Sequence, residues 1–198
     1  MGLSVATLRL LLIAMTIASA GCAARYTASP GSTTIAPGLQ FAIPTGRELG
    51  YSVETAQLIT AHVRDQVQAF QAYVSVTPDK ITIIALDPFG GRALTVTATD
   101  DAIHTEAAPI VPAVLRPGNI LADLAIVYWP ASAVRRSLAG TSATLYDDKR
   151  ERTITDNGRE VVHVSYQGPH ENTWTSVAHL RNIAYGYELD LRSTVTAK

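Results

Sequence analysis

The sequence predicts a mainly β protein of the α+β class, in which antiparallel strands enclose one pair of helices. Three features indicate this fold: β-like runs between residues 48 and 108, helical spacing between 119 and 138, and renewed alternation after residue 150. Strands grouped on both sides of a helical pair favour an antiparallel sheet over a parallel α/β fold. Such a sheet has one face to bury, and the helical pair is expected to cover it.

The first group of strands lies between residues 48 and 108. The run ITIIAL at 81–86 is apolar on both faces, whereas RALTVTATD at 92–100 alternates. In the alternating run, Leu94 and Val96 share one face and threonines occupy the other, which is typical of a half-buried strand. The DPFGG segment between the two runs is composed of turn residues and predicts a hairpin.

The middle of the chain changes to helical spacing. From Ile120, apolar residues recur at i, i+1, i+4, i+7 and i+8, which predicts a helix with Asn119 as its N-cap. Trp129-Pro130 ends this helix, and a second short helix follows up to Gly140. At the joint, Trp129 either fills the core or marks a hinge that lets the helices swing to admit a ligand.

The second group of strands follows the helices. Asn157-Gly158 is a strong signal for a two-residue hairpin turn. In the strand after that turn and in the last strand of the chain, alternate residues are expected to share the buried face: Val162, Val164, Tyr166, Tyr185, Tyr187, Leu189 and Leu191.

The N-terminus predicts a bacterial secretory leader. Arg9 precedes an apolar run at 10–18, followed by the small residues 19–21. That run is shorter than the ~20 residues of a membrane-spanning helix. The only cysteine, Cys22, follows directly, and SAGC resembles a lipobox, which implies cleavage before Cys22 and its acylation. Ala23, next to the cysteine, is not aspartate, and by the sorting rule of such lipoproteins the resemblance implies an anchor in the outer membrane, facing the periplasm.

Two readings compete with lipidation: a buried or free thiol, and ordinary cleavage nearby. Lipidation is favoured because a free exposed thiol is a liability in an oxidising compartment. The domain organisation is then a signal peptide at 1–21, a lipidated cysteine with a flexible tether at 22–46, and a folded domain at 47–198. The tether is inferred from Ser, Thr, Pro, Gly and Ala without periodicity.

The charge balance limits the partners. The chain has 16 basic and 17 acidic residues and a net charge of −1. This balance argues against nucleic acid and against an anionic membrane surface as a partner. The membrane is expected as a partner through the lipid anchor alone.

Two motifs resemble a known family. LADLAIVYWP at 121–130 and LRNIAYGYELDL at 180–191 resemble uncharacterised bacterial lipoproteins that accompany aryl-polyene biosynthesis genes and are similar to LolB, the outer-membrane lipoprotein receptor. The resemblance covers most of residues 48–193. It implies a LolA/LolB-like incomplete antiparallel β-barrel with helices packed into its open mouth, where LolB-like proteins bind acyl chains.

The sequence carries no catalytic signature. It lacks a nucleophile elbow, a phosphate-binding loop, a dinucleotide fingerprint and a metal-ligand spacing of histidines, so no catalytic residue, cofactor or metal is predicted. Apolar and aromatic side chains are candidates to line an acyl cavity, with an ordinary packed core as the alternative for each. These candidates are Leu94, Val96, Tyr128, Trp129, Val162, Val164, Tyr166, Tyr185 and Tyr187.

The function expected from these features is that of an outer-membrane-anchored lipoprotein that binds or transfers a hydrophobic, lipid-like cargo in the periplasm. The cargo would be a lipoprotein acyl group or a polyene lipid. The alternative is a non-enzymatic scaffold or assembly subunit that docks on other envelope proteins and binds no small ligand.

Overall fold

The computed structural model describes residues 24–28, 31–109, 111, 116–168 and 174–197. The N-terminal elements are β1 (Ala24–Ala28), β2 (Ser32–Ala36), β3 (Leu39–Ala42) and the 3-10 helix η1 (Gly46–Leu49). The first strand group comprises β4 (Val53–Val63), β5 (Gln66–Thr77), β6 (Lys80–Leu86), β7 (Arg92–Ala98) and β8 (Ile103–Ala107). Two helices follow, α2 (Pro117–Tyr128) and α3 (Ala131–Ser137). The second strand group comprises β9 (Ala143–Asp147), β10 (Glu151–Asp156), β11 (Arg159–Gln167), β12 (Val177–Asn182) and β13 (Tyr187–Ala197).

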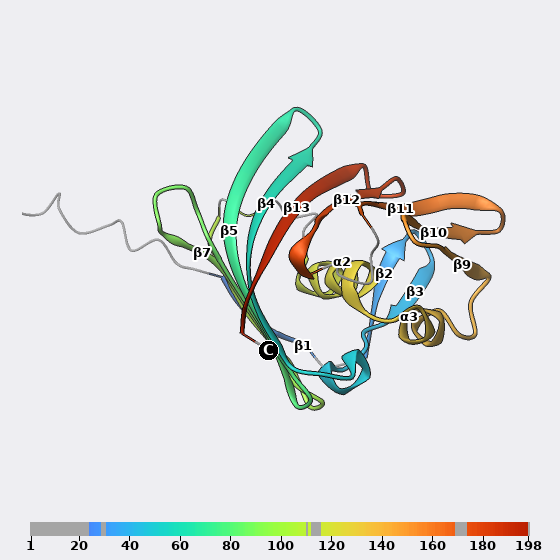
Figure 1. The fold of residues 1–198 in the computed structure, drawn as a ribbon, viewed down its shortest axis with the longest axis horizontal. Helices are drawn as coiled ribbons and strands as arrows, with labels where there is room; N and C mark the ends of the chain where they lie inside the picture. The colour runs from blue at the N-terminus through green and yellow to red at the C-terminus, as the bar shows by residue number, and fades with distance from the viewer. Residues whose placement is uncertain (1–23, 29–30, 110, 112–115, 169–173, 198) are drawn as a thin grey trace, which may run out of the picture.

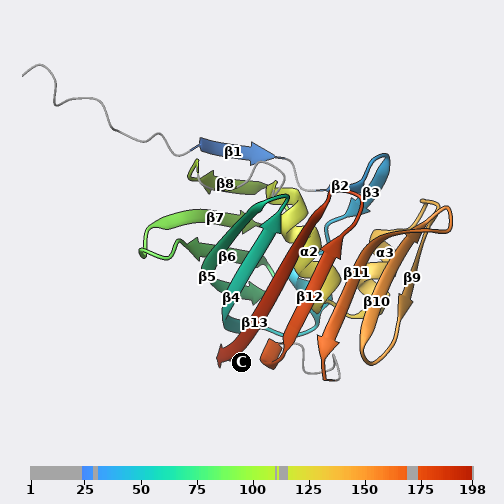
Figure 2. The ribbon, with the colours of Figure 1, turned by 90° about the horizontal axis from the view of Figure 1, so that it is seen from above.

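Eleven of the described strands form one antiparallel sheet, in the order β1-β8-β7-β6-β5-β4-β13-β12-β11-β10-β9. The last strand, β13, pairs with β4 and so joins the two strand groups. The sheet curves around α2, and its outermost described strands, β1 and β9, remain separate edges (Figure 1, Figure 2). The predicted mainly β fold, an open antiparallel half-barrel with two helices, is confirmed. None of the helices in the described ranges has the length and hydropathy of a membrane span.

The segment predicted as a flexible tether is folded wherever it is described. β1 pairs with β8 at the edge of the sheet, and β2 pairs with β3 in a separate hairpin. Ile35 and Phe41 of this hairpin are completely buried in the core. The tether prediction for residues 22–46 is therefore wrong for these strands, and the folded part begins by Ala24 instead of residue 47. The strands are short and rich in Ser, Thr and Ala, and only packing against distant elements orders them.

The helical pair is confirmed, with a different start. Pro117 occupies the first turn of α2 and Arg116 is its N-cap, instead of Asn119. The Asn119 side chain is buried, and its Oδ1 accepts a hydrogen bond from the Thr33 hydroxyl of β2 at 3.0 Å. Because α2 lies inside the curve of the sheet, residues on all of its sides are buried (Figure 1). A helix buried all round needs no polar face, which explains its continuous apolar run.

The hairpin turns largely follow the prediction. Asn157 and Gly158 both have positive φ, 48° and 76°, as a type I′ turn requires. Tyr185 is a correction, because it lies in the turn between β12 and β13 and not on a strand. The Asn182 side chain accepts a hydrogen bond from the Tyr185 backbone N–H at 2.9 Å, and Gly186 at φ 67° completes the turn.

Candidate functional site

The predicted cavity residues gather around α2 in a single apolar core. Tyr185 is half-buried in its turn, and the other eight are buried: Leu94, Val96, Tyr128, Trp129, Val162, Val164, Tyr166 and Tyr187. Cys22, the predicted lipidation site, lies outside the described residues. The polar atoms of the buried aromatic residues decide how firmly α2 is held.

Hydrogen bonds fix the C-terminal end of α2. The buried Arg152 of β10 donates from Nη1 to the carbonyl oxygens of Ile126 at 2.8 Å and Trp129 at 2.7 Å. The Tyr166 hydroxyl donates to the Val127 carbonyl at 2.9 Å. The last carbonyl groups of a helix lack partners in the helix and carry the negative end of its dipole, so a guanidinium suits them. An ion pair with Asp147 balances the charge of Arg152.

A second buried polar group lies where α2 meets β4 and β13. Gln57 Nε2 donates to the Tyr128 hydroxyl at 2.8 Å, and that hydroxyl lies 2.7 Å from the Ser193 hydroxyl. The Tyr128 ring stacks on Trp174 with 3.9 Å between ring centroids. Burial raises the pKa of Tyr128, so its hydroxyl stays protonated and available for these bonds.

Asp123 is the one charged residue inside α2. Its Oδ2 accepts a hydrogen bond from the Tyr187 hydroxyl at 2.7 Å, whereas its Oδ1 is buried without a hydrogen-bond partner. Burial raises the pKa of Asp123 to about 7, and the Tyr187 bond opposes this rise. Asn182 lies beside Tyr187 and donates to the Ile35 carbonyl of β2 at 3.0 Å. The cavity prediction omitted Asp123, although an acidic residue within an apolar helix was a visible signal.

The side-chain hydrogen bonds that hold α2 in place connect it to only one part of the sheet. Within the described residues, the side-chain hydrogen bonds of α2 and Trp129 run to β2, to the loop after β3, and to β4, β10, β11 and β13. None of them reaches β5, β6, β7 or β8. The inner face of those strands is largely apolar, with the buried Thr105 of β8 as an exception, and includes Phe70, Val74, Ile83, Leu94 and Val96. We call this interface between α2 and the inner face of β5–β8 the apolar seam.

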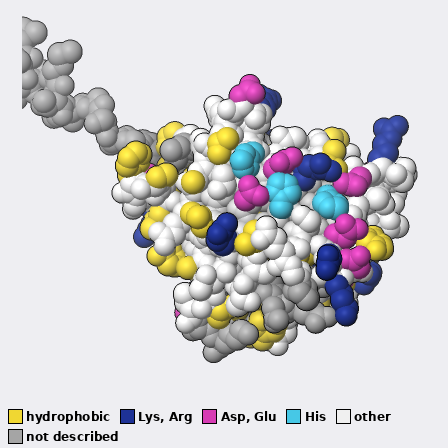
Figure 3. All heavy atoms as spheres, turned by 45° about the horizontal axis from the view of Figure 1, so that its top comes forward, with side chains coloured by type: hydrophobic (Ala, Val, Ile, Leu, Met, Phe, Trp, Pro, Cys, Tyr) yellow, Lys and Arg dark blue, Asp and Glu magenta, His cyan; other side chains and the backbone are white. Residues whose placement is uncertain are grey.

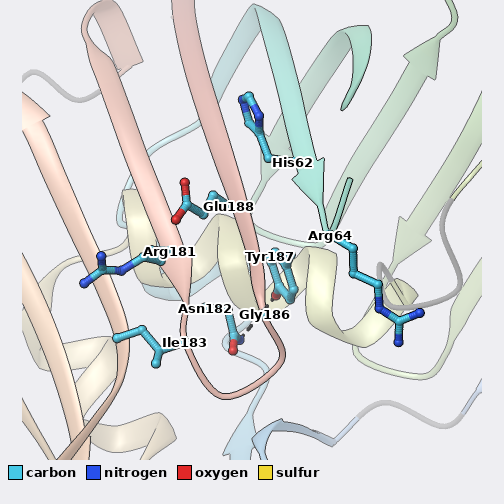
Figure 4. Close-up of a pocket in the computed structure, with 8 residues that line it drawn as sticks. All are labelled: His62, Arg64, Arg181, Asn182, Ile183, Gly186, Tyr187 and Glu188. Carbon is cyan, nitrogen blue, oxygen red and sulfur yellow. Dashed lines mark hydrogen bonds between the residues drawn. The ribbon is translucent and has the colours of Figure 1, made fainter. Parts of the chain in front are cut away.

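A pocket of about 620 Å³ opens at the rim of the sheet, between the β4–β5 turn and the β12–β13 turn (Figure 4). We call it the rim pocket. Among its lining residues are His62, Arg64, Arg181, Asn182, Tyr187 and Glu188. Tyr187 is the one predicted cavity residue that lines it, and the Tyr187 hydroxyl connects the pocket to Asp123.

A second pocket of about 500 Å³ lies at the other end of the strands, near the β5–β6 and β7–β8 turns. Its lining includes Arg47 and Asp79, which form an exposed ion pair at 2.6 Å. Exposed ion pairs of this kind contribute little to stability. None of the predicted cavity residues lines this pocket.

Histidine side chains gather on one face of the molecule (Figure 3), and two of them, His62 and His179, contact Asp190. His62 Nε2 lies 3.0 Å from Asp190 Oδ2, and His179 Nδ1 lies 2.7 Å from Asp190 Oδ1. These contacts, that with His179 first, lower the pKa of Asp190. Because each histidine binds a different oxygen of one carboxylate, the three groups do not converge on a common point. Across the described residues, no group of three or more His, Cys, Asp or Glu side chains is arranged to hold a metal ion.

Comparison with known proteins identifies the family. No curated protein matches the chain. A family model described as a protein of unknown function, DUF3261, matches residues 54–195. The match runs from β4 to β13 and so includes the rim pocket, both helices and the apolar seam. Since it spans well over half of the sequence, the chain belongs to the DUF3261 family.

Proposed function

We propose that this protein is a LolB-like lipoprotein, anchored in the outer membrane through Cys22, that binds a hydrophobic lipid-like cargo and releases it without chemical change. The cargo is a lipoprotein acyl group or a polyene lipid. The observation that carries the proposal is the apolar seam. An acyl chain that enters there exchanges apolar contacts for apolar contacts and breaks no hydrogen bond of α2.

The shape of the sheet supports this proposal. β1 and β9 do not pair with each other in the described part of the chain, so the sheet is open and its two halves are free to change their separation. A closed barrel would have to break strand pairing to widen. Here the interior widens by bending the sheet, while α2 stays bound to β10, β11 and β13.

An exposed aromatic residue supports contact with a bilayer. Phe89, at the tip of the β6–β7 turn, is 97% exposed. β1 begins at the same end of the sheet, because Ala24 pairs with Ala107 and Ala107 pairs with Leu94, near the start of β7 (Figure 2). Cys22 precedes Ala24 by two residues. Acyl chains on Cys22 and the Phe89 ring therefore face the same bilayer.

Native mass spectrometry tests the proposal. The chain from Ala23 onward, exported with a cleavable signal from a cell that makes the cargo, is expected to carry an extra mass that organic solvent removes. The seam variant Val96→Trp is expected to reduce that mass, because a larger side chain fills the space of the acyl chain. Thr97→Trp, on the opposite face of the same strand, is the matched control. A clean protein mass that stays clean after challenge with acyl probes would refute the proposal.

The convex face favours a second candidate function, the docking of a scaffold or assembly subunit on another envelope protein. Leu58 on β4 is 53% exposed and Tyr73 on β5 is 45% exposed. The half-buried Ile84 of β6 pairs with Tyr73, and Gln71 of β5 lies between Leu58 and the half-buried Leu86. Neighbouring exposed apolar residues on a sheet face are typical of interaction sites. Under this alternative, Leu58→Glu abolishes co-purification of an envelope protein and leaves acyl binding unchanged.

A further inference from the structure

We infer that the rim pocket is a headgroup subsite for an amphipathic cargo whose polar end carries a phosphate and an ammonium group. Arg64 binds the phosphate and Glu188 binds the ammonium. The inference rests on the proposed function and narrows its cargo to a free lipid, because the acyl groups of a lipoprotein carry neither a phosphate nor an ammonium group.

Arg64 is an unusual residue for its position. It is the first residue of a two-residue turn between Val63 and Gln66, and its φ of 53° lies in the left-handed region. Glycine adopts this conformation without steric cost, whereas a residue with a Cβ is strained there. Strained residues of this kind concentrate at functional sites. The turn itself therefore gives no reason for a long basic side chain at this position.

Arg64 is also an uncommitted cation. No hydrogen bond or ion pair within the described residues involves it, whereas Arg181 of the same pocket lies 3.4 Å from Glu160. Asp65 follows Arg64 in the turn but does not line the pocket. An exposed guanidinium with no protein partner, at the edge of a pocket, is free to bind an anion.

Glu188 supplies the opposite charge on the other side of the pocket. It lies across the strands from His62 and from Arg181, and its one ion-pair contact in the described residues is to His179 at 3.7 Å. The carboxylate of Asp190, by contrast, is bound to two histidines at 3.0 Å or less. Figure 4 shows Glu188 and Arg64 on opposite sides of Tyr187. Arg181 lies directly across the strands from Glu188 and is paired with Glu160, so Glu188 is the one carboxylate among the described lining residues and stands opposite the unpaired Arg64.

This arrangement selects a headgroup with both charges. A guanidinium binds phosphate through two parallel hydrogen bonds, and a carboxylate accepts hydrogen bonds from an ammonium. A purely cationic headgroup would be repelled by Arg64, and a purely anionic one would make no favourable contact with Glu188. A volume of about 620 Å³ accommodates a group of this size.

The position of the pocket connects it to the interior. Tyr187 lines the pocket, and its hydroxyl bonds to Asp123 on α2. Tyr187 is 1% exposed and faces the interior, whereas Glu188 faces the convex side, so the headgroup lies over the rim of the sheet at the end of β13 that contacts α2. Its acyl chains are then in reach of the apolar interior around that helix, so headgroup and chains are bound by adjoining parts of the molecule.

Calorimetry with short-chain lipids below their micelle concentration tests the inference. The protein used is the chain from residue 22 onward with the substitution Cys22→Ser. It contains every described strand, and because it cannot be acylated it needs no detergent. The probes are dihexanoyl phosphatidylethanolamine, dihexanoyl phosphatidylglycerol without an ammonium, free phosphoethanolamine without acyl chains, and 1-decanol without a charged headgroup. We expect the phosphatidylethanolamine to bind at least tenfold more tightly than each of the other three.

Variants assign the charges. Arg64→Gly relieves the strained turn, so the melting temperature is expected to stay unchanged. The affinity for the phosphatidylethanolamine is expected to fall at least tenfold. Glu188→Gln is expected to remove the preference for phosphatidylethanolamine over phosphatidylglycerol. Arg135→Gln removes one positive charge at an exposed position of α3 and is the control. It is expected to change neither the affinity for the phosphatidylethanolamine nor the preference over phosphatidylglycerol.

The outcomes separate the two proposals. Binding of 1-decanol with no preference among the lipids, or no effect of Arg64→Gly, would overturn the headgroup subsite and leave the carrier function standing. Free phosphoethanolamine binding as tightly as the lipid would show a site for a soluble metabolite and also overturn it. Failure of all four probes to bind would refute the carrier function itself.

Discussion

Replacement of Asp123 by asparagine is expected to remove a pH dependence from the stability of the fold. Asp123 is buried between α2 and β13, with one oxygen bonded to Tyr187 and the other without a partner. Burial raises its pKa from 3.8 to about 7. Asparagine keeps an acceptor for the Tyr187 hydroxyl but does not titrate. It also leaves a buried amide donor without a partner, which costs about 1–3 kcal/mol at every pH.

The sign and size of this pH dependence of the unfolding free energy follow from proton linkage. With the folded pKa above the unfolded one, the folded state binds the proton more tightly. The stabilisation is complete below pH 3.8 and is lost as the pH rises through about 7. Each pH unit between these values is worth about 1.4 kcal/mol, so the wild type loses roughly 2–3 kcal/mol between pH 5 and pH 8 through this group. The stability of Asp123→Asn relative to wild type rises by the same amount.

Urea unfolding of both proteins at pH 5, 6, 7 and 8 measures this difference. Contributions of the other ionisable groups are common to both proteins and cancel in the difference. Asp101→Asn, at an exposed turn, is the matched control and is expected to give a constant difference. A constant difference for Asp123→Asn as well would show that the carboxyl does not titrate near neutral pH. If the stability of Asp123→Asn relative to wild type instead fell as the pH rises, the fold would stabilise the charged form of Asp123.

Three further changes test other parts of the structure. Arg152→Ala is expected to cost about 3–5 kcal/mol of unfolding free energy, because it removes both hydrogen bonds to the end of α2 and the buried ion pair with Asp147; a loss under 1 kcal/mol in urea unfolding would contradict this. Gly46→Ala is expected to lower the melting temperature by several degrees, since a Cβ there would lie 2.0 Å from the Thr77 carbonyl oxygen, and an unchanged value would exclude that close contact. Phe89→Ser is expected to leave the melting temperature unchanged and to weaken vesicle co-sedimentation of the chain from Ala23 about tenfold or more, and equal binding would remove Phe89 from the proposed membrane contact.

The sequence predicts the elements whose signal is local. Alternation needs only neighbouring residues, and the buried face of β7 and β11 is therefore predicted correctly through Leu94, Val96, Val162 and Val164. The Asn157-Gly158 turn is likewise determined by the conformational freedom of its own two residues. The helical pair is recognised because its apolar spacing continues over two turns and more.

The elements that the sequence does not predict depend on distant partners. β1 is a strand because it pairs with β8, about 80 residues away, and its composition alone is that of a linker. Asn119 is a reasonable N-cap by local rules, but its side chain instead bonds to Thr33. The rim pocket is formed by two turns that meet only because β13 pairs with β4. No local pattern reports such pairings, and the charges of Arg64 and Glu188 acquire a meaning only through them.

α2 is hydrogen-bonded to β10, β11 and β13 but, among the described residues, makes no side-chain hydrogen bond to β5–β8, and this difference determines which part moves in the proposed carrier. Displacing the helix from β10 would break the two hydrogen bonds that the buried Arg152 donates to the Ile126 and Trp129 carbonyl groups, at a cost of several kcal/mol. Parting the apolar seam sacrifices only apolar contacts, which an incoming acyl chain replaces at about 25 cal/mol per Å². Trp129 is held on both sides, by its Nε1 bond to the Thr45 carbonyl and by Arg152 at its own carbonyl, so a swing at the Trp129-Pro130 joint would break both. The motion that costs less free energy is an outward bend of β5–β8. β1 pairs with β8 at the edge of this strand group and is the described strand closest to Cys22 in the sequence. In the proposed carrier, the strand group that opens is then the one nearest the proposed anchor.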